Sequence, residues 1–117
     1  MEHLFFCIGL SLILMHEMDA IRCKEWRILP LLSWLDDKWG FQVFMFAHVP
    51  LFCLLFVGLL QKNTNVSLIF GLNIFFMIHF VLHLLFLLHK KNEFKDWISW
   101  SIITGCALSG ALDLILS

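Results

Sequence analysis

Four long apolar segments, separated by short polar stretches, dominate this sequence of 117 residues. They cover residues 4–21, 40–60, 66–88 and 97–116. Each has about 18–23 residues, which as an α-helix rising about 1.5 Å per residue crosses a hydrocarbon layer about 30 Å thick. Strands are excluded as spanning elements, because four strands cannot close a barrel and lipid does not tolerate open sheet edges. The pattern predicts an all-α fold, a four-helix bundle integral to a membrane that forms one domain over residues 1–117.

The composition supports a membrane protein and argues against a nucleic-acid-binding one. Hydrophobic residues make up 61% of the chain and charged residues 15%, whereas a soluble domain has roughly 45–50% and about 25%. The formal net charge is −1, and the eight Lys and Arg residues form no basic stripe or arm. We therefore expect membrane lipid around the chain and exclude nucleic acid as a partner.

The basic residues predict how the helices are oriented. Seven of the eight lie in the first and third loops, and Lys62 lies in the second. By the positive-inside rule, the first and third loops face the cytoplasm and both termini lie outside it.

The first segment is expected to be a retained helix, because Glu2 precedes it where a cleaved signal peptide has Lys or Arg. Residues 26–35 are too short to span and predict a broken interfacial segment bent at Pro30.

Ionisable residues inside apolar segments are costly and often mark a functional site. Counted from the cytoplasmic ends at about 1.5 Å per residue, histidines from three helices fall at similar depths. They are His16, His48, His79 and His83, and the acids Glu17 and Asp19 lie at the edge of the same layer. In a small bundle we expect these side chains to converge in the cytoplasmic half of the membrane.

The spacing of these residues favours metal binding. His79 and His83 are four residues apart and share one helix face, where two imidazoles can hold one ion. His16 and Asp19 are three apart, so the acid could be a ligand or could orient the imidazole. We predict zinc or iron, with manganese also possible, because the layer offers nitrogen and oxygen ligands and no thiolate. The predicted ligands are His16, Asp19, His48, His79 and His83, with His16 and Asp19 as the predicted catalytic pair.

Each of these residues also has a purely structural interpretation. His48 lies two residues before Pro50 and could hydrogen-bond a backbone carbonyl that the proline frees. Residues 16–19 could mark the end of the helix at the headgroups, with Asp19 paired to Arg22. The agreement in depth between the helices favours the functional interpretation.

Asp113 and the small residues near it are predicted to have other roles. The fourth segment begins at the cytoplasm, so Asp113 lies near the outer face, where it could pair with His3 or Glu2 rather than join the histidines. Small residues recur four apart on this segment, at Gly105 and Ser109, Cys106 and Gly110, and Ala107 and Ala111. Such a face allows close approach of a helix from the same chain, a second copy or a larger membrane partner.

The order of these motifs resembles a known group of proteins. His16-x-x-Asp19, then "HVPL", then His79-x-x-x-His83 is similar to small bacterial four-helix membrane proteins, including the HXXEE-type family. In that family the first-helix motif is a His followed three residues later by two acids, whereas here Ala20 replaces the second acid. The resemblance implies a bacterial inner-membrane protein with enzymatic or metal-dependent activity but no settled reaction.

Two classes of function remain open. The first is a membrane-embedded enzyme that acts on a lipid or another apolar substrate, with the His and acid cluster as metal ligands or as acid and base. The second is a non-catalytic membrane subunit or sensor, in which the cluster holds the bundle together, binds a proton or metal ion, or docks a partner. A transporter would require an oligomer, because four short helices form no pathway alone.

Overall fold

The computed structural model describes residues 2–117, which form four long helices. These are α1 (Leu4–Arg22), α2 (Asp37–Leu59), α3 (Val66–Phe86) and α4 (Trp97–Leu116), with two short 3-10 turns, η1 (Glu25–Arg27) and η2 (Leu32–Trp34), between α1 and α2. All four long helices are long and apolar enough to span a membrane, and the described residues include no strand. The predicted all-α membrane bundle is confirmed, with helix ends within three residues of the predicted segments.

Side chains cap the starts of the helices. Asp36, Asn65 and Asp96 precede α2, α3 and α4, and each accepts a hydrogen bond from the backbone N–H three residues further on. Such caps satisfy donors that the first turn of a helix leaves without an intrahelical partner. His3 precedes α1 and provides no such cap. Asp113 of α4 takes its place, accepting a hydrogen bond from the backbone N–H of Phe6 at 3.2 Å.

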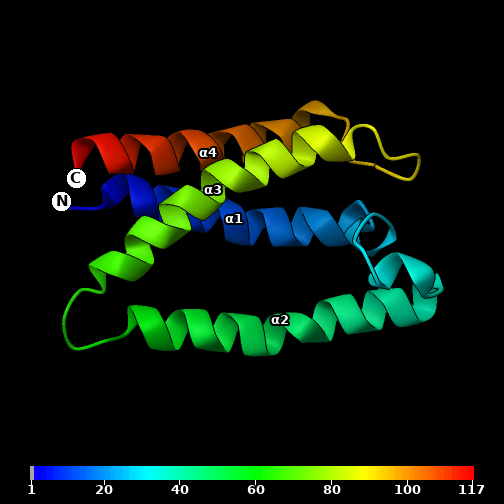
Figure 1. Cartoon of the computed structure of the whole chain (residues 1–117), viewed down its shortest axis with the longest axis horizontal. Coiled ribbons are helices and arrows are strands. Elements are labelled where there is room, and N and C mark those ends of the chain that lie inside the picture. Colours follow the sequence, from blue (N-terminus) through cyan, green and yellow to red (C-terminus); the bar gives the residue numbers. More distant parts are fainter. Residues whose placement is uncertain (1) are drawn as a thin grey trace.

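Helices α1, α3 and α4 pack closely together. α1 and α4 run side by side and α3 crosses them obliquely (Figure 1). A Cβ atom at Gly110 of α4 would lie 2.8 Å from the carbonyl oxygen of Asn73 in α3, and one at Gly105 would lie 3.1 Å from Leu12 of α1. Two of the small residues predicted to admit another helix therefore contact helices of the same chain. An oligomer or membrane partner at this face stays a prediction.

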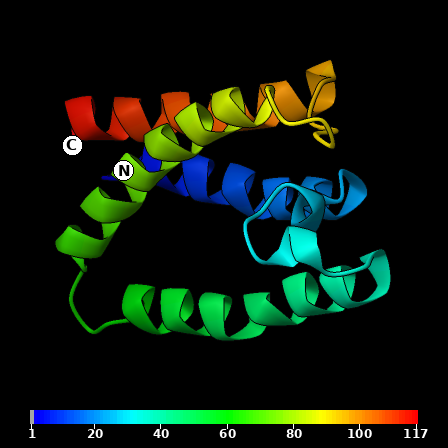
Figure 2. The same ribbon diagram turned by 45° about the vertical axis from the view of Figure 1, so that its right-hand side comes forward.

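Helix α2 stands apart from the other three, as Figures 1 and 2 show from two directions. Gly40 and Phe44 are its buried residues. Both lie near its start, where they contact Trp26 of η1. The indole N–H of Trp26 donates a hydrogen bond to Asp37 at 3.0 Å. The turn η1 thus anchors one end of α2 while most of the helix has little contact with the bundle.

The segment between α1 and α2 has the predicted break at Pro30, between η1 and η2. Its first half packs against the protein, because Glu25, Trp26 and Ile28 are each no more than 8% exposed. Lys24, in the left-handed backbone conformation with φ of 53°, lies between α1 and η1, where the chain changes direction. The side chain of Glu25 consequently reaches the packed helices α1 and α3.

Asp113 ties together the helix ends near the two termini. Its carboxylate accepts a hydrogen bond from the Asn73 amide at 2.7 Å and lies 2.9 Å from Nδ1 of His3. The residue is 1% exposed. The predicted pairing of Asp113 with His3 is confirmed, and Asp113 lies apart from the histidines described below.

Replacing Asp113 with alanine should destabilise the bundle. The substitution leaves the buried Asn73 amide and the Phe6 N–H without an acceptor, which costs about 1–3 kcal/mol per group. We expect Asp113→Ala to lower the free energy of unfolding by about 2 kcal/mol or more, measured by Trp fluorescence during denaturant unfolding in detergent. The control Ser11→Ala removes an exposed hydroxyl and should change it by less than about 0.5 kcal/mol. Equal effects of the two variants would contradict this role of Asp113.

Candidate metal centre

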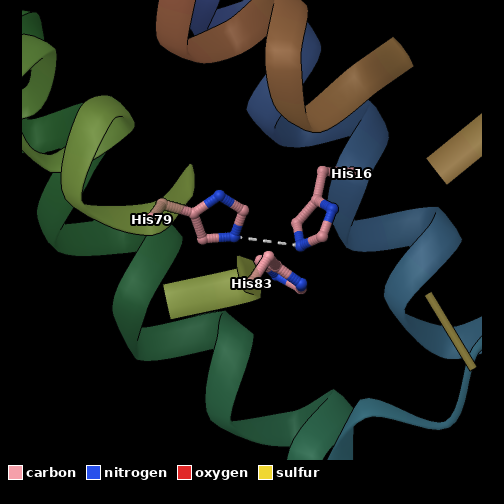
Figure 3. Close-up of side chains that lie close together, drawn as sticks. All are labelled: His16, His79 and His83. Carbon is pink, nitrogen blue, oxygen red and sulfur yellow. Dashed lines mark hydrogen bonds between the residues drawn. The ribbon is translucent and has the colours of Figure 1, made fainter. Parts of the chain in front are cut away.

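Three histidines from two helices converge inside the bundle. His79 and His83 lie four residues apart on α3 and so share a face, and His16 of α1 lies opposite them. Figure 3 shows the three rings directed toward one another. Nε2 of His16 lies 3.1 Å from Nε2 of His79. One nitrogen of each ring lies within 4.8 Å of the others, which makes a group able to hold a metal ion. We refer to these residues as the His triad.

The His triad is buried and short of hydrogen bonds. His16, His79 and His83 are 0%, 8% and 1% exposed. Four of their six ring nitrogens have no hydrogen-bond partner among the described residues: Nδ1 of all three rings and Nε2 of His83. Leaving a buried polar group unpaired costs about 1–3 kcal/mol, so most buried polar groups in proteins are paired. The triad thus concentrates buried ring nitrogens, four of which have no partner among the described residues.

Glu25 of η1 brings a carboxylate to the triad. One of its oxygens lies 3.9 Å from Nε2 of His16 and the other 3.9 Å from Nε2 of His83. Burial, followed by the charge of nearby Glu17, raises the pKa of Glu25 to about 8. A carboxyl group in this position is therefore largely neutral at pH 7 unless a cation lies beside it. No periodic pattern in residues 23–28 shows which side chain turns inward, so sequence reasoning missed Glu25.

Phe94, in the loop between α3 and α4, covers the triad. Its ring stacks against His16 with 5.4 Å between centroids and meets His83 edge-on at 4.6 Å. The residue is fully buried, and its carbonyl accepts a hydrogen bond from the indole N–H of Trp100 at 2.8 Å. This aromatic cover keeps water from that side of the rings. The sequence signals a polar loop here and contains nothing that marks Phe94 as buried.

The structure does not bring Asp19 into the cluster, although it lies on α1 three residues after His16. Its carboxylate accepts hydrogen bonds from Arg22 at 2.7 Å and from the Ser99 hydroxyl of α4 at 2.6 Å. Three residues correspond to about 300° of helical rotation, so the two side chains of α1 diverge by about 60°. That difference lets His16 face α3 while Asp19 faces α4. The pairing of Asp19 with Arg22 agrees with the structural interpretation of this residue, and its bond to Ser99 holds α1 to α4.

His48 also lies outside the triad. Its Nε2 is 2.5 Å from a carboxylate oxygen of Glu17, and its Nδ1 is 2.6 Å from the Phe44 carbonyl oxygen. His48 was predicted to join the triad, but the group of nitrogens close enough to share an ion contains His16, His79 and His83 and not His48. The Glu17–His48 pair instead links α1 to the middle of α2.

A cleft of about 340 Å³ opens beside the triad, where α1, α2, α3 and the segment between α1 and α2 line it. Four ionisable side chains line it: Glu17, Glu25, His48 and His79. The rest of its lining is apolar. His79 is the member of the triad that borders this cleft, so a molecule in the cleft can approach the cluster from the side of α2.

Comparison with known proteins places the chain in a family without assigning an activity. A family of unknown function, DUF6713, matches residues 2–117. No curated protein and no solved structure matches the chain. The match does not test a bacterial source or the HXXEE-type motif, which remain predictions. Because the match covers nearly the whole sequence, the chain belongs to DUF6713, a family of unknown function.

Proposed function

We propose that His16, His79 and His83 bind one zinc or iron ion and that the protein is a membrane-embedded enzyme acting on a lipid or another apolar substrate. The observation that carries the proposal is the convergence of three buried imidazoles with four unpaired nitrogens. Polar clusters that only hold helices together normally satisfy their own hydrogen bonds. A metal ion is the ligand that gathers several imidazole nitrogens at one point.

The donor set and its spacing fit zinc. Zinc–nitrogen bonds of about 2.0–2.1 Å place the nitrogens of a tetrahedral site about 3.4 Å apart. Nε2 of His16 and Nε2 of His79 are already 3.1 Å apart, and one nitrogen from each of the three rings lies within 4.8 Å of the others. Small side-chain rotations bring all three to bonding distance. Iron is the alternative, because imidazole and carboxylate ligands suit both metals.

The position of Glu25 favours a catalytic metal site over a purely structural one. Catalytic zinc sites have three protein ligands and keep one position open. A zinc ion held by these three imidazoles would lower the pKa of a water molecule and so supply a nucleophile for an ester or amide carbon. Glu25 faces Nε2 of both His16 and His83 at 3.9 Å, close enough to orient such a water and accept its proton. In this proposal His16 is a ligand and Glu25 takes the role of the acid that sequence reasoning gave to Asp19.

A non-catalytic membrane subunit or metal sensor is the second candidate function. The observation that favours it is the exposure of α2, in which Gly40 and Phe44 are the buried residues. A partner protein in the membrane could cover this helix. In that case the triad would bind a metal without turnover, so metal content and activity together distinguish the two candidates.

Metal analysis tests the site directly. We expect protein incubated with zinc, desalted in detergent and measured by plasma mass spectrometry to hold about one ion per chain. The double variant His79→Ala/His83→Ala should hold less than about a tenth of that, because one imidazole alone binds zinc weakly. His48→Ala is the matched control, since it removes an intramembrane imidazole outside the triad. Wild-type protein without metal, or equal loss in His48→Ala, would refute the site.

The role of Glu25 requires a separate measurement. Glu25→Gln keeps the shape of the side chain and removes a proton acceptor, so it should retain zinc. Loss of a general base typically costs about 10²–10⁴-fold in rate. We expect at least about 100-fold slower hydrolysis of a long-chain p-nitrophenyl ester. Wild-type protein that binds zinc but hydrolyses neither this ester nor the corresponding anilide would favour the subunit or sensor.

A further inference from the structure

Adjacent hollows lie between α2 and the helices α1 and α3. α2 meets the bundle near its start at Trp26, in its middle at the Glu17–His48 pair, and near its end, where Leu68 packs on Gly58. Two hollows of about 340 Å³ and 300 Å³ lie between these contacts. They share three lining residues: Glu17, Leu51 and Phe75. We call the two together the α2 cleft.

The α2 cleft changes character along its length. The hollow nearer Leu68 is lined by apolar side chains apart from Glu17. The hollow nearer η1 contains Glu17, Glu25, His48 and His79 among apolar residues. Ligand pockets typically measure about 300–1,000 Å³ and combine apolar walls with a few polar groups. The cleft therefore matches a molecule with a long apolar chain and a polar group at one end.

The charges around the polar end exclude an anionic headgroup. Neither Lys nor Arg is among the described residues that line the cleft. Two arginines near this end are paired elsewhere. Arg22 binds Asp19 and Asp96, and Arg27 binds Asp37 and Glu93. A phosphate or free carboxylate would lie beside the acids Glu17 and Glu25, and no Lys or Arg in the described lining could pair with it.

We propose that the α2 cleft binds a single-chain neutral lipid, with its alkyl chain against Leu51 and Phe75 and its uncharged ester, amide or alcohol group beside His79 and Glu25. Because all four helices are apolar enough to span a membrane, such a molecule can enter from the bilayer without crossing water. The inference rests on the proposed function for the reaction that follows binding. Binding itself needs the cleft and not the metal.

Photoaffinity labelling tests the inference. The probe is a monooleoylglycerol analogue that carries a diazirine and an alkyne on its chain, added to purified protein in lipid nanodiscs. We expect saturable labelling of residues in α2 and α3. Excess monooleoylglycerol should reduce it about tenfold, and oleoyl lysophosphatidic acid should compete far less.

A pair of tryptophan variants distinguishes the cleft from the general lipid surface. Leu51→Trp places a larger side chain in the wall that both hollows share, where it occupies space for the lipid. It should reduce saturable labelling about tenfold. Val57→Trp adds the same side chain on α2 at an exposed position outside either hollow and should leave labelling unchanged. Equal labelling of the two variants, or equal competition by lysophosphatidic acid, would overturn the inference. Metal content and the thermal unfolding midpoint should match the wild type in both variants.

A second metal-site variant separates this inference from the proposed function. His16→Ala/His83→Ala should lose zinc and still be labelled, because neither residue lines the cleft and His79, Leu51 and the rest of the wall remain. Labelling that follows the predicted pattern in a protein without metal would support the lipid site and refute the metal enzyme. Zinc binding together with non-saturable labelling would support the metal site and refute the lipid site.

Discussion

The need to satisfy polar groups away from water organises this bundle. Inside a membrane, each polar side chain must find a partner within the protein or bear the cost of lacking one. Asp113 binds Asn73 and the start of α1 at one end, and Asp19 binds Ser99 of α4 toward the other. These two carboxylates hold α1, α3 and α4 in a fixed arrangement. The His triad lies within that arrangement, and four of the five buried side-chain nitrogen and oxygen atoms that lack a partner among the described residues belong to it.

The rigid and loose parts of the structure adjoin each other at the triad. α1 and α3 carry the three imidazoles, and Asp113 and Ser99 of α4 hydrogen-bond to these two helices. α2 is held mainly through η1 and the Glu17–His48 pair. The close packing of α1, α3 and α4 suits a site that must position ligands precisely. The loose attachment of α2 suits a substrate that must enter from lipid. Glu25 connects the two, since η1 anchors α2 and also carries the carboxylate that faces the triad.

Hydropathy and depth accounted for much of the fold and part of the candidate site. Apolar length predicted all four helices, because crossing a bilayer requires about 20 apolar residues whatever the packing. Depth predicted the pairing of Asp113 with His3 and the approach of His16 to His79 and His83. Depth does not specify the direction of a side chain around the helix axis. Depth predicted Asp19 and His48 in the same layer as the triad, whereas in the structure Asp19 faces α4 and His48 faces Glu17.

By itself, the sequence determined the number, length and order of the helices and the level at which the histidines lie, because both follow from one-dimensional hydropathy and a fixed rise per residue. The tertiary structure alone decided which imidazoles meet, that Glu25 and Phe94 complete their surroundings, and that α2 leaves a cleft beside them. These features depend on helix rotation and on the fold of two connecting segments. Contacts between residues far apart in the chain set both, and no local pattern in the sequence records them.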